Sequence, residues 1–150
     1  MTTLSGFNAV TPRNALPFLF AGQSQREFYV NEALARIDML LHPCVEGELA
    51  EPPTAPADGA CYLVASSATG DWAGREGHIA GWIAGAWTFA APYEGIRVRD
   101  RTTASVLSYD GQWRRHTAPT LPSGGSVIDD EARSAIGEVV AILRQHGLFD

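Results

Sequence analysis

The side chains best suited to bind a ligand in this sequence are aromatic, and they gather between positions 62 and 113. Flat rings with polar neighbours can hold a sugar, because the rings stack on its apolar face and the neighbours bind its hydroxyls. Small β domains also use Trp and Tyr as core residues and cross-strand pairs, so a purely structural role is the alternative. These aromatic residues are Tyr62, Trp72, Trp82, Trp87, Phe89, Tyr93, Tyr109 and Trp113.

A glycan site is predicted around Tyr109 and Trp113, because both flank an Asp-Gly dipeptide that is typical of exposed hairpin turns. Trp82 and the arginines Arg97 and Arg99 complete the candidate set, since guanidinium groups match the carboxylates of acidic sugars. Trp72 and Trp87 are predicted to be core residues. The polar side chains that could bind hydroxyls are Asp71, Arg75, Glu76, Asp110 and Gln112.

Catalytic and metal-binding patterns are missing from the sequence. The candidate carboxylates lie mostly in predicted linkers and turns, and they are Glu46, Glu48, Glu51, Asp58 and Asp71. The four histidines are far apart without partners at ligand spacing. The Gly-x-Ser-x-Gly nucleophile motif does not occur, and the stretch 123–126 (SGGS) lacks the lysine of a phosphate-binding loop. We therefore expect no enzymatic activity, no metal site and no cofactor.

Composition narrows the class of protein further. The chain has 150 residues, of which 45% are hydrophobic, and a formal net charge of −6 without any lysine. Its basic runs, at 97–101 and 114–115, are too short for a nucleic-acid binder. No apolar run approaches the ~20 residues of a membrane span, and no secretory signal is evident. Cys44 and Cys61 are predicted to be partly buried free thiols, although their pairing stays open.

Two amphipathic helices are predicted near the ends of the chain. The first spans 24–41, with Ser24 and Glu27 as a capping box and Asp38 on its polar face. The second spans 129–146, with acidic residues at its start and Gly147 after its end. The apolar stripe of the first helix is Val30, Ala33, Leu34, Ile37, Leu40 and Leu41, and that of the second is Ala132, Ile136, Val139, Val140 and Leu143.

Between the helices the pattern changes to short strands and tight turns. Strands are predicted at 60–65, 78–82, 86–89, 95–99, 105–109 and 112–115, and the segment 46–58 is predicted to be a linker. The hairpins around Ala84-Gly85 and Asp110-Gly111 resemble each other and are expected in one sheet. The predicted fold is α+β: an amphipathic helix, an antiparallel hairpin-rich sheet or small barrel, and a C-terminal helix. It divides into an extended arm (1–23), a helix-plus-β domain (24–116) and a C-terminal helix (126–150).

Several strings match one known family in order, and the chain resembles members of the domain of unknown function 2793, which occurs in prophages and gene-transfer-agent-like clusters. The resemblance covers roughly 16–95, and the segment 129–148 is similar to the ending of longer members. The family has no established catalytic residues. The matching strings are 16–27 (LPFLFAGQSQRE), 30–38 (VNEALARID), 56–64, 68–74 (ATGDWAG), 79–80, 85–89 (GAWTF) and Pro92.

This resemblance implies a virion component of a phage-like particle, such as a head spike or tail fibre. The chain would be made in the bacterial cytoplasm, form a homotrimer, and contact other capsid, spike or tail proteins and host capsular polysaccharide. The alternative is a structural adaptor that docks a larger fibre and has no ligand of its own. Exposed aromatics would favour attachment, whereas exposed apolar helix faces with buried aromatics would favour the adaptor. The arm at 16–20 and the first helix are expected to mediate self-association or docking.

Overall fold

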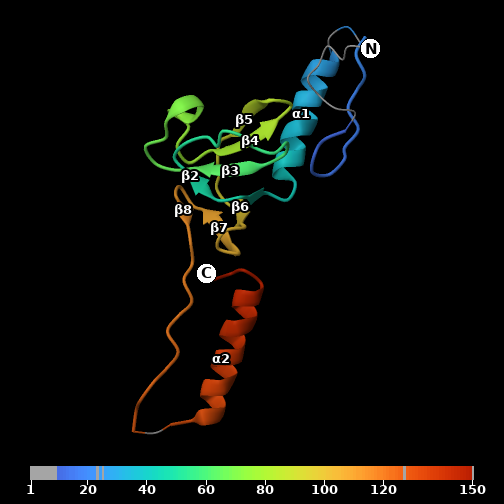
Figure 1. The fold of residues 1–150 in the computed structure, drawn as a ribbon. Helices are drawn as coiled ribbons and strands as arrows, with labels where there is room; N and C mark the ends of the chain where they lie inside the picture. The colour runs from blue at the N-terminus through green and yellow to red at the C-terminus, as the bar shows by residue number, and fades with distance from the viewer. Residues whose placement is uncertain (1–9, 23, 25, 127, 150) are drawn as a thin grey trace.

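The computed structural model describes residues 10–149 except 23, 25 and 127. In this part of the chain the fold is α+β, with one helix beside a β domain and a second helix extending from it (Figure 1). The elements are α1 (Arg26–Leu40), β1 (Cys44–Val45), β2 (Glu48–Leu49), β3 (Cys61–Val64), η1 (Gly70–Trp72), β4 (Ile79–Ile83), β5 (Ala86–Ala90), β6 (Arg97–Asp100), β7 (Ser105–Tyr109), β8 (Trp113–Arg114) and α2 (Asp130–Gln145).

The strands form two four-stranded sheets that share one crossing segment. One sheet has the order β2-β3-β4-β5 and the other β1-β6-β7-β8, and the segment 44–49 passes from the second sheet to the first. The β1–β6 and β2–β3 pairs are parallel and the remaining pairs are antiparallel. The sheets are therefore mixed and not antiparallel throughout as predicted. The predicted linker at 46–58 contains the short strand β2, because Val45 pairs with β6 while Glu48, three residues later, pairs with β3.

A hairpin supplies one edge of each sheet. In the β4–β5 hairpin, Ala84 and Gly85 have φ of 52° and 79°, as a two-residue type I′ turn requires. In the β7–β8 hairpin Tyr109 pairs with Trp113, so the turn has three residues rather than the Asp-Gly pair alone. The hairpins lie in different sheets and not in one sheet as expected, because aromatic-turn-aromatic patterns carry no information about which strands become neighbours.

One hydrophobic core joins α1 to both sheets. Its buried members come from the helix and from β1, β3, β4, β6 and β7, with Ile96 just before β6. A smaller cluster lies on the other face of β3 and β4, where Trp72 packs with Val64 and Ala80. The main cluster consists of Ala35, Met39, Val45, Cys61, Leu63, Ile79, Ile83, Ile96, Val98 and Leu107.

Helix α1 packs against the rest of the fold with a face that differs from the predicted apolar stripe. Its buried residues are Asn31, Ala35, Asp38 and Met39. Met39 lies over Gly81 of β4, where a Cβ atom would come within 2.5 Å of the Met39 sulfur, so the close approach of helix and strand requires glycine.

The predicted apolar stripe of α1 is largely the face that it exposes, and this part of the prediction was wrong. Val30, Ile37 and Leu41 are 41%, 49% and 51% exposed. Asp38, expected on the outer polar face, is buried. Among the described residues the predicted capping-box bonds between Ser24 and Glu27 are not seen: Ser24 has a left-handed φ of 59°, and Glu27 accepts a hydrogen bond from the Gly22 N–H. Periodicity reveals the two faces of a helix but not which of them meets the fold.

Helix α2 has the predicted ends. Asp129 accepts a hydrogen bond from the Ala132 N–H at 2.9 Å, which caps the first turn. At the other end the Leu148 N–H bonds to the Leu143 carbonyl and the Gly147 N–H to the Arg144 carbonyl, the pattern of a Schellman motif. Of its predicted apolar stripe, however, only Val140 is buried.

Candidate functional site

The structure contains a groove where the two sheets meet, with a volume of about 540 Å³. The β7–β8 hairpin forms one wall, and the segments before β4 and after β5 form the other. Its aromatic lining is Tyr109 and Trp113, and its polar lining includes Glu48, Ser66, Glu76, His78 and Gln112. A groove of this volume, with two aromatic rings and several hydrogen-bonding groups, has the size and the chemical groups to accommodate a short glycan.

Tyr109 and Trp113 are held firmly in this groove. Their rings stack edge to face with centroids 5.3 Å apart, and both pack against the main core. The indole N–H of Trp113 donates to the Gly77 carbonyl at 2.8 Å, which ties the hairpin of one sheet to the other sheet. A ligand can therefore use the ring surfaces but not the indole N–H, and Trp113 has a structural role as well.

A charged network fixes the Glu48 side of the groove. Arg115 donates to the Glu48 carboxylate at 3.1 Å and to the Asp100 carboxylate at 2.6 Å. Burial alone would raise the pKa of Asp100, but hydrogen bonds from Arg115 and the Thr102 backbone outweigh it, so the pKa is lowered. These partners keep Asp100 ionised, which does not suit a general acid.

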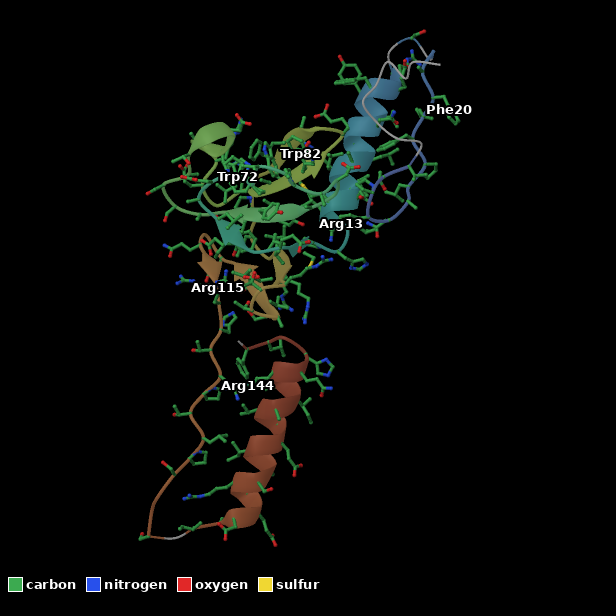
Figure 2. The ribbon with its side chains drawn as sticks, in the orientation of Figure 1. Arg13, Phe20, Trp72, Trp82, Arg115 and Arg144 are labelled. Atoms are coloured by element: carbon green, nitrogen blue, oxygen red, sulfur yellow. The ribbon has the colours of Figure 1, made fainter. Side chains whose placement is uncertain are left out.

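The other three predicted site residues lie elsewhere. Trp82 pairs with Trp87 across β4 and β5, at a centroid distance of 4.9 Å, and Figure 2 shows it on the α1 side of the β domain. Arg97 and Arg99 are exposed on β6, alternating with buried residues. They pair with Ser108 and Val106, so strand alternation places them on the opposite face of the sheet from Tyr109. Tyr109 and Trp113 line the groove together, whereas Trp82, Arg97 and Arg99 do not.

The aromatic residues predicted to be core lie in the smaller cluster. Trp72 is fully buried, as predicted, and its ring meets that of Trp87 at 4.9 Å. Within the described residues the buried Nε1 of Trp72 has no hydrogen-bond partner. Tyr62 completes the cluster by contacting both tryptophans.

A polar clamp, which sequence reasoning missed, holds the arm 10–22 against α1. The Thr11 hydroxyl donates to the Asp38 carboxylate at 2.8 Å, and the backbone N–H groups of Arg13 and Asn14 donate to it at 3.0 and 2.7 Å. Burial raises the pKa of Asp38, but these hydrogen bonds outweigh burial, so the pKa is lowered. Asn31 adds a second clamp, accepting from the Leu19 N–H at 2.9 Å.

A second pocket, of about 440 Å³, lies between the arm, the segment 57–60 and β1. Its charged groups already have partners within the chain. Arg101 bonds to Glu46 at 2.8 Å, and Arg13 donates to the carbonyls of Met39 and His42 at the end of α1. This pocket therefore offers a ligand little unsatisfied charge.

Both cysteines are free thiols, as expected. Burial raises the pKa of Cys61 to about 11, so this thiol stays protonated at neutral pH and is a poor nucleophile. Cys44 accepts a hydrogen bond from the Arg101 Nε at 3.3 Å. Among the described residues, no group of three or more His, Cys, Asp or Glu side chains is arranged to hold a metal ion.

Large apolar side chains are exposed along both helices and the arm. On the arm and α1 they include Phe20, Tyr29 and Ile37, and on α2 they include Ile136, Val139 and Ile142. Exposed apolar stripes of this kind mark docking surfaces more often than accidental exposure. In the described part of the chain, neither helix is long and apolar enough to cross a membrane.

The fold and groove define an α+β protein of two mixed sheets that share one crossing segment and carry a helix at each end. The chain belongs to the family of proteins of unknown function DUF2793, whose model matches residues 30–114. The match confirms the family and ends with the last strand, β8, beyond residue 95. It begins at residue 30, so the resemblance at 16–27 and at 129–148 lies outside it. Among curated proteins, none matches the chain.

Proposed function

We propose that the protein is a structural component of a phage-like or gene-transfer particle that docks onto neighbouring chains through its helices. One observation carries this proposal: α1 buries Asn31 and Asp38 and exposes an apolar stripe. A helix held in that orientation leaves apolar surface in water unless another chain covers it. The resemblance to prophage-encoded proteins is the reason for placing the chain in a phage-like particle. The aromatic side chains of the groove are half-buried, which favours a structural adaptor over host attachment as the main role.

Particles purified from the bacterium that encodes the chain test this proposal. Wild type and Glu32→Gln, an exposed polar change on the same helix, should be found in the particles by mass spectrometry. Ile37→Glu places a charge in the exposed stripe and should be lost from them while the purified variant stays folded. Particles that lack the wild-type chain would contradict the role, and incorporation of Ile37→Glu at the wild-type level would show that α1 is not the docking surface.

Binding of host surface polysaccharide is a second candidate function, and the groove favours it. Its rings could stack on one sugar while Glu76 and Gln112 bind hydroxyls. A single site of this kind would bind at about millimolar, and display of several copies would raise the avidity by ~10² or more.

This second candidate needs variants that leave the fold intact. Trp113→Ala would remove the bond to Gly77 and a core contact, so its effect would not separate binding from folding. Glu76→Ala and Gln112→Ala change exposed groove residues and should lower binding to purified capsule several-fold. Gln145→Ala, an exposed change on α2, is the control. Equal capsule binding by all four proteins, or no binding by wild type, would reject the groove as a glycan site.

A further inference from the structure

Helix α2 exposes the centre of its apolar stripe. Ile136, Val139 and Ile142 are 46%, 55% and 53% exposed, although they are spaced by three residues along one side of the helix. Figure 1 shows α2 extending away from both sheets, beyond a long extended segment. The β domain therefore leaves this stripe uncovered.

Contacts within the chain hold α2 along one side and at its C-terminal end. Arg133 donates to the Gly124 carbonyl of the preceding segment, and Val140 is buried on the same side of the helix. At the C-terminal end the Gly147 carbonyl accepts from the Val106 N–H of β7 at 2.7 Å. The Gly147 bond joins the end of α2 to the β domain, and the Arg133 bond joins the helix to the preceding segment. The stripe stays exposed.

The charges beside the stripe indicate what covers it. At 3.6 residues per turn, Glu131 and Glu138 lie on one flank of the stripe, seven residues apart. Arg133 and Arg144 lie on the other flank, eleven residues or about three turns apart. Arg133 already donates to the Gly124 carbonyl, so the exposed Arg144 is the cation available to a neighbouring copy. In a parallel pair of these helices the acidic flank of one copy meets the basic flank of the next, whereas an antiparallel pair brings like charges together.

We propose that α2 is the interface between copies of this chain, packed side by side and parallel. The apolar stripe supplies the driving force, and the opposite flanks select the parallel orientation. Each copy then carries its β domain at the same end of the bundle, so several β domains face one way. This inference does not depend on the proposed particle or on glycan binding, because it uses only the stripe and its flanks.

Disulfide cross-linking of the full chain tests the orientation. Ala132 lies on the middle line of the stripe, at its N-terminal end, so Ala132→Cys should form an intermolecular disulfide under mild oxidation if the helices are parallel. In an antiparallel pair centred on the stripe, position 132 faces position 143, and the two 132 positions lie roughly 16 Å apart. Ser134→Cys, on the opposite face, and wild type with its two native cysteines are the controls.

The expected result is a cross-link in Ala132→Cys and little or none in the controls. Absence of that cross-link, or equal cross-linking of Ser134→Cys, would overturn the proposal. Charge reversal gives a second readout: Glu138→Arg and Arg144→Glu alone should each weaken association about five-fold, and the double variant should restore it. Stronger association of Glu138→Arg alone would indicate antiparallel packing and would also overturn it.

Discussion

Asp38 illustrates how a single carboxylate can position a segment that has no regular secondary structure of its own. It accepts hydrogen bonds from Thr11, Arg13 and Asn14, so the arm follows α1 although it forms only an isolated bridge between Val10 and Pro17. A buried charge is costly unless it is paired or hydrogen-bonded, and here the donors come from the arm itself. The same bonds that satisfy Asp38 therefore decide which face of α1 is buried.

Replacement of Asp38 should destabilise the fold in a pH-dependent way. Asp38→Asn should lower the free energy of unfolding at pH 7 by about 1–3 kcal/mol, because donors aimed at a carboxylate lose their charged acceptor. The pKa of Asp38 lies below its ordinary value of 3.8, so its contribution is complete above about pH 4 and is lost as the pH falls through the lowered pKa. Urea unfolding from pH 7 to pH 2 measures both effects.

Glu32→Gln, which removes an exposed carboxylate from the same helix, is the matched control and should leave the pH profile unchanged. Asp100 has a lowered pKa as well, so some acid destabilisation should remain in Asp38→Asn. If the difference between wild type and Asp38→Asn is the same at pH 7 and pH 2, the charged state of Asp38 does not contribute.

At the scale of elements, helix α1 is the main departure from the sequence-based expectation. Its existence and approximate ends follow from the spacing of Val30, Ile37 and Leu41, which would be the buried face in an isolated domain. The structure instead buries Asn31 and Asp38, because the arm supplies their hydrogen-bond partners.

The two faces of α1 should respond differently to mutation. Met39→Ala should cost about 2–5 kcal/mol of unfolding free energy, because it opens a cavity in the core against β4. Ile37→Gln should change it by less than about 0.5 kcal/mol, because this side chain is exposed. Chemical denaturation of dilute protein measures both, and a large loss in Ile37→Gln together with a small loss in Met39→Ala would show that α1 packs with its apolar face inward.

Local signals predicted several parts of the fold correctly. The Asp129 cap, the Gly147 ending of α2, the turn at Ala84-Gly85 and the alternation along β6 all follow from residues within a few positions of one another. The separation into two sheets did not follow, since it depends on parallel pairs between β1 and β6 and between β2 and β3. Strands of two residues leave almost no periodic signal.

The candidate site could be predicted only in part for the same reason. Tyr109 and Trp113 are close in sequence and share a hairpin, so their proximity was predictable. Glu48 reaches the groove through the crossing segment and through Arg115, a contact that no local pattern indicates. Arg97 and Arg99 lie on the other face of their strand, which becomes apparent only once the pairing with β7 is known.

At the scale of the whole molecule, the β domain has a buried core, whereas the two helices bury only some of their apolar side chains. The core joins α1 and both sheets, whereas α1 and α2 each keep an apolar stripe exposed. A domain that is stable by itself has no need of these stripes, and assembly with other copies or other chains gives them a role. We therefore propose that this protein associates with other copies or other chains through these stripes.

The molar mass of the full chain in solution shows whether copies of it associate. Multi-angle light scattering during size-exclusion chromatography, repeated over a wide range of loading concentrations, should give a multiple of the single-chain mass. Val139→Asp, which places a charge in the exposed stripe of α2, should shift the mass toward one chain while circular dichroism stays unchanged. A wild-type protein that remains a single chain at every concentration would contradict self-association through α2.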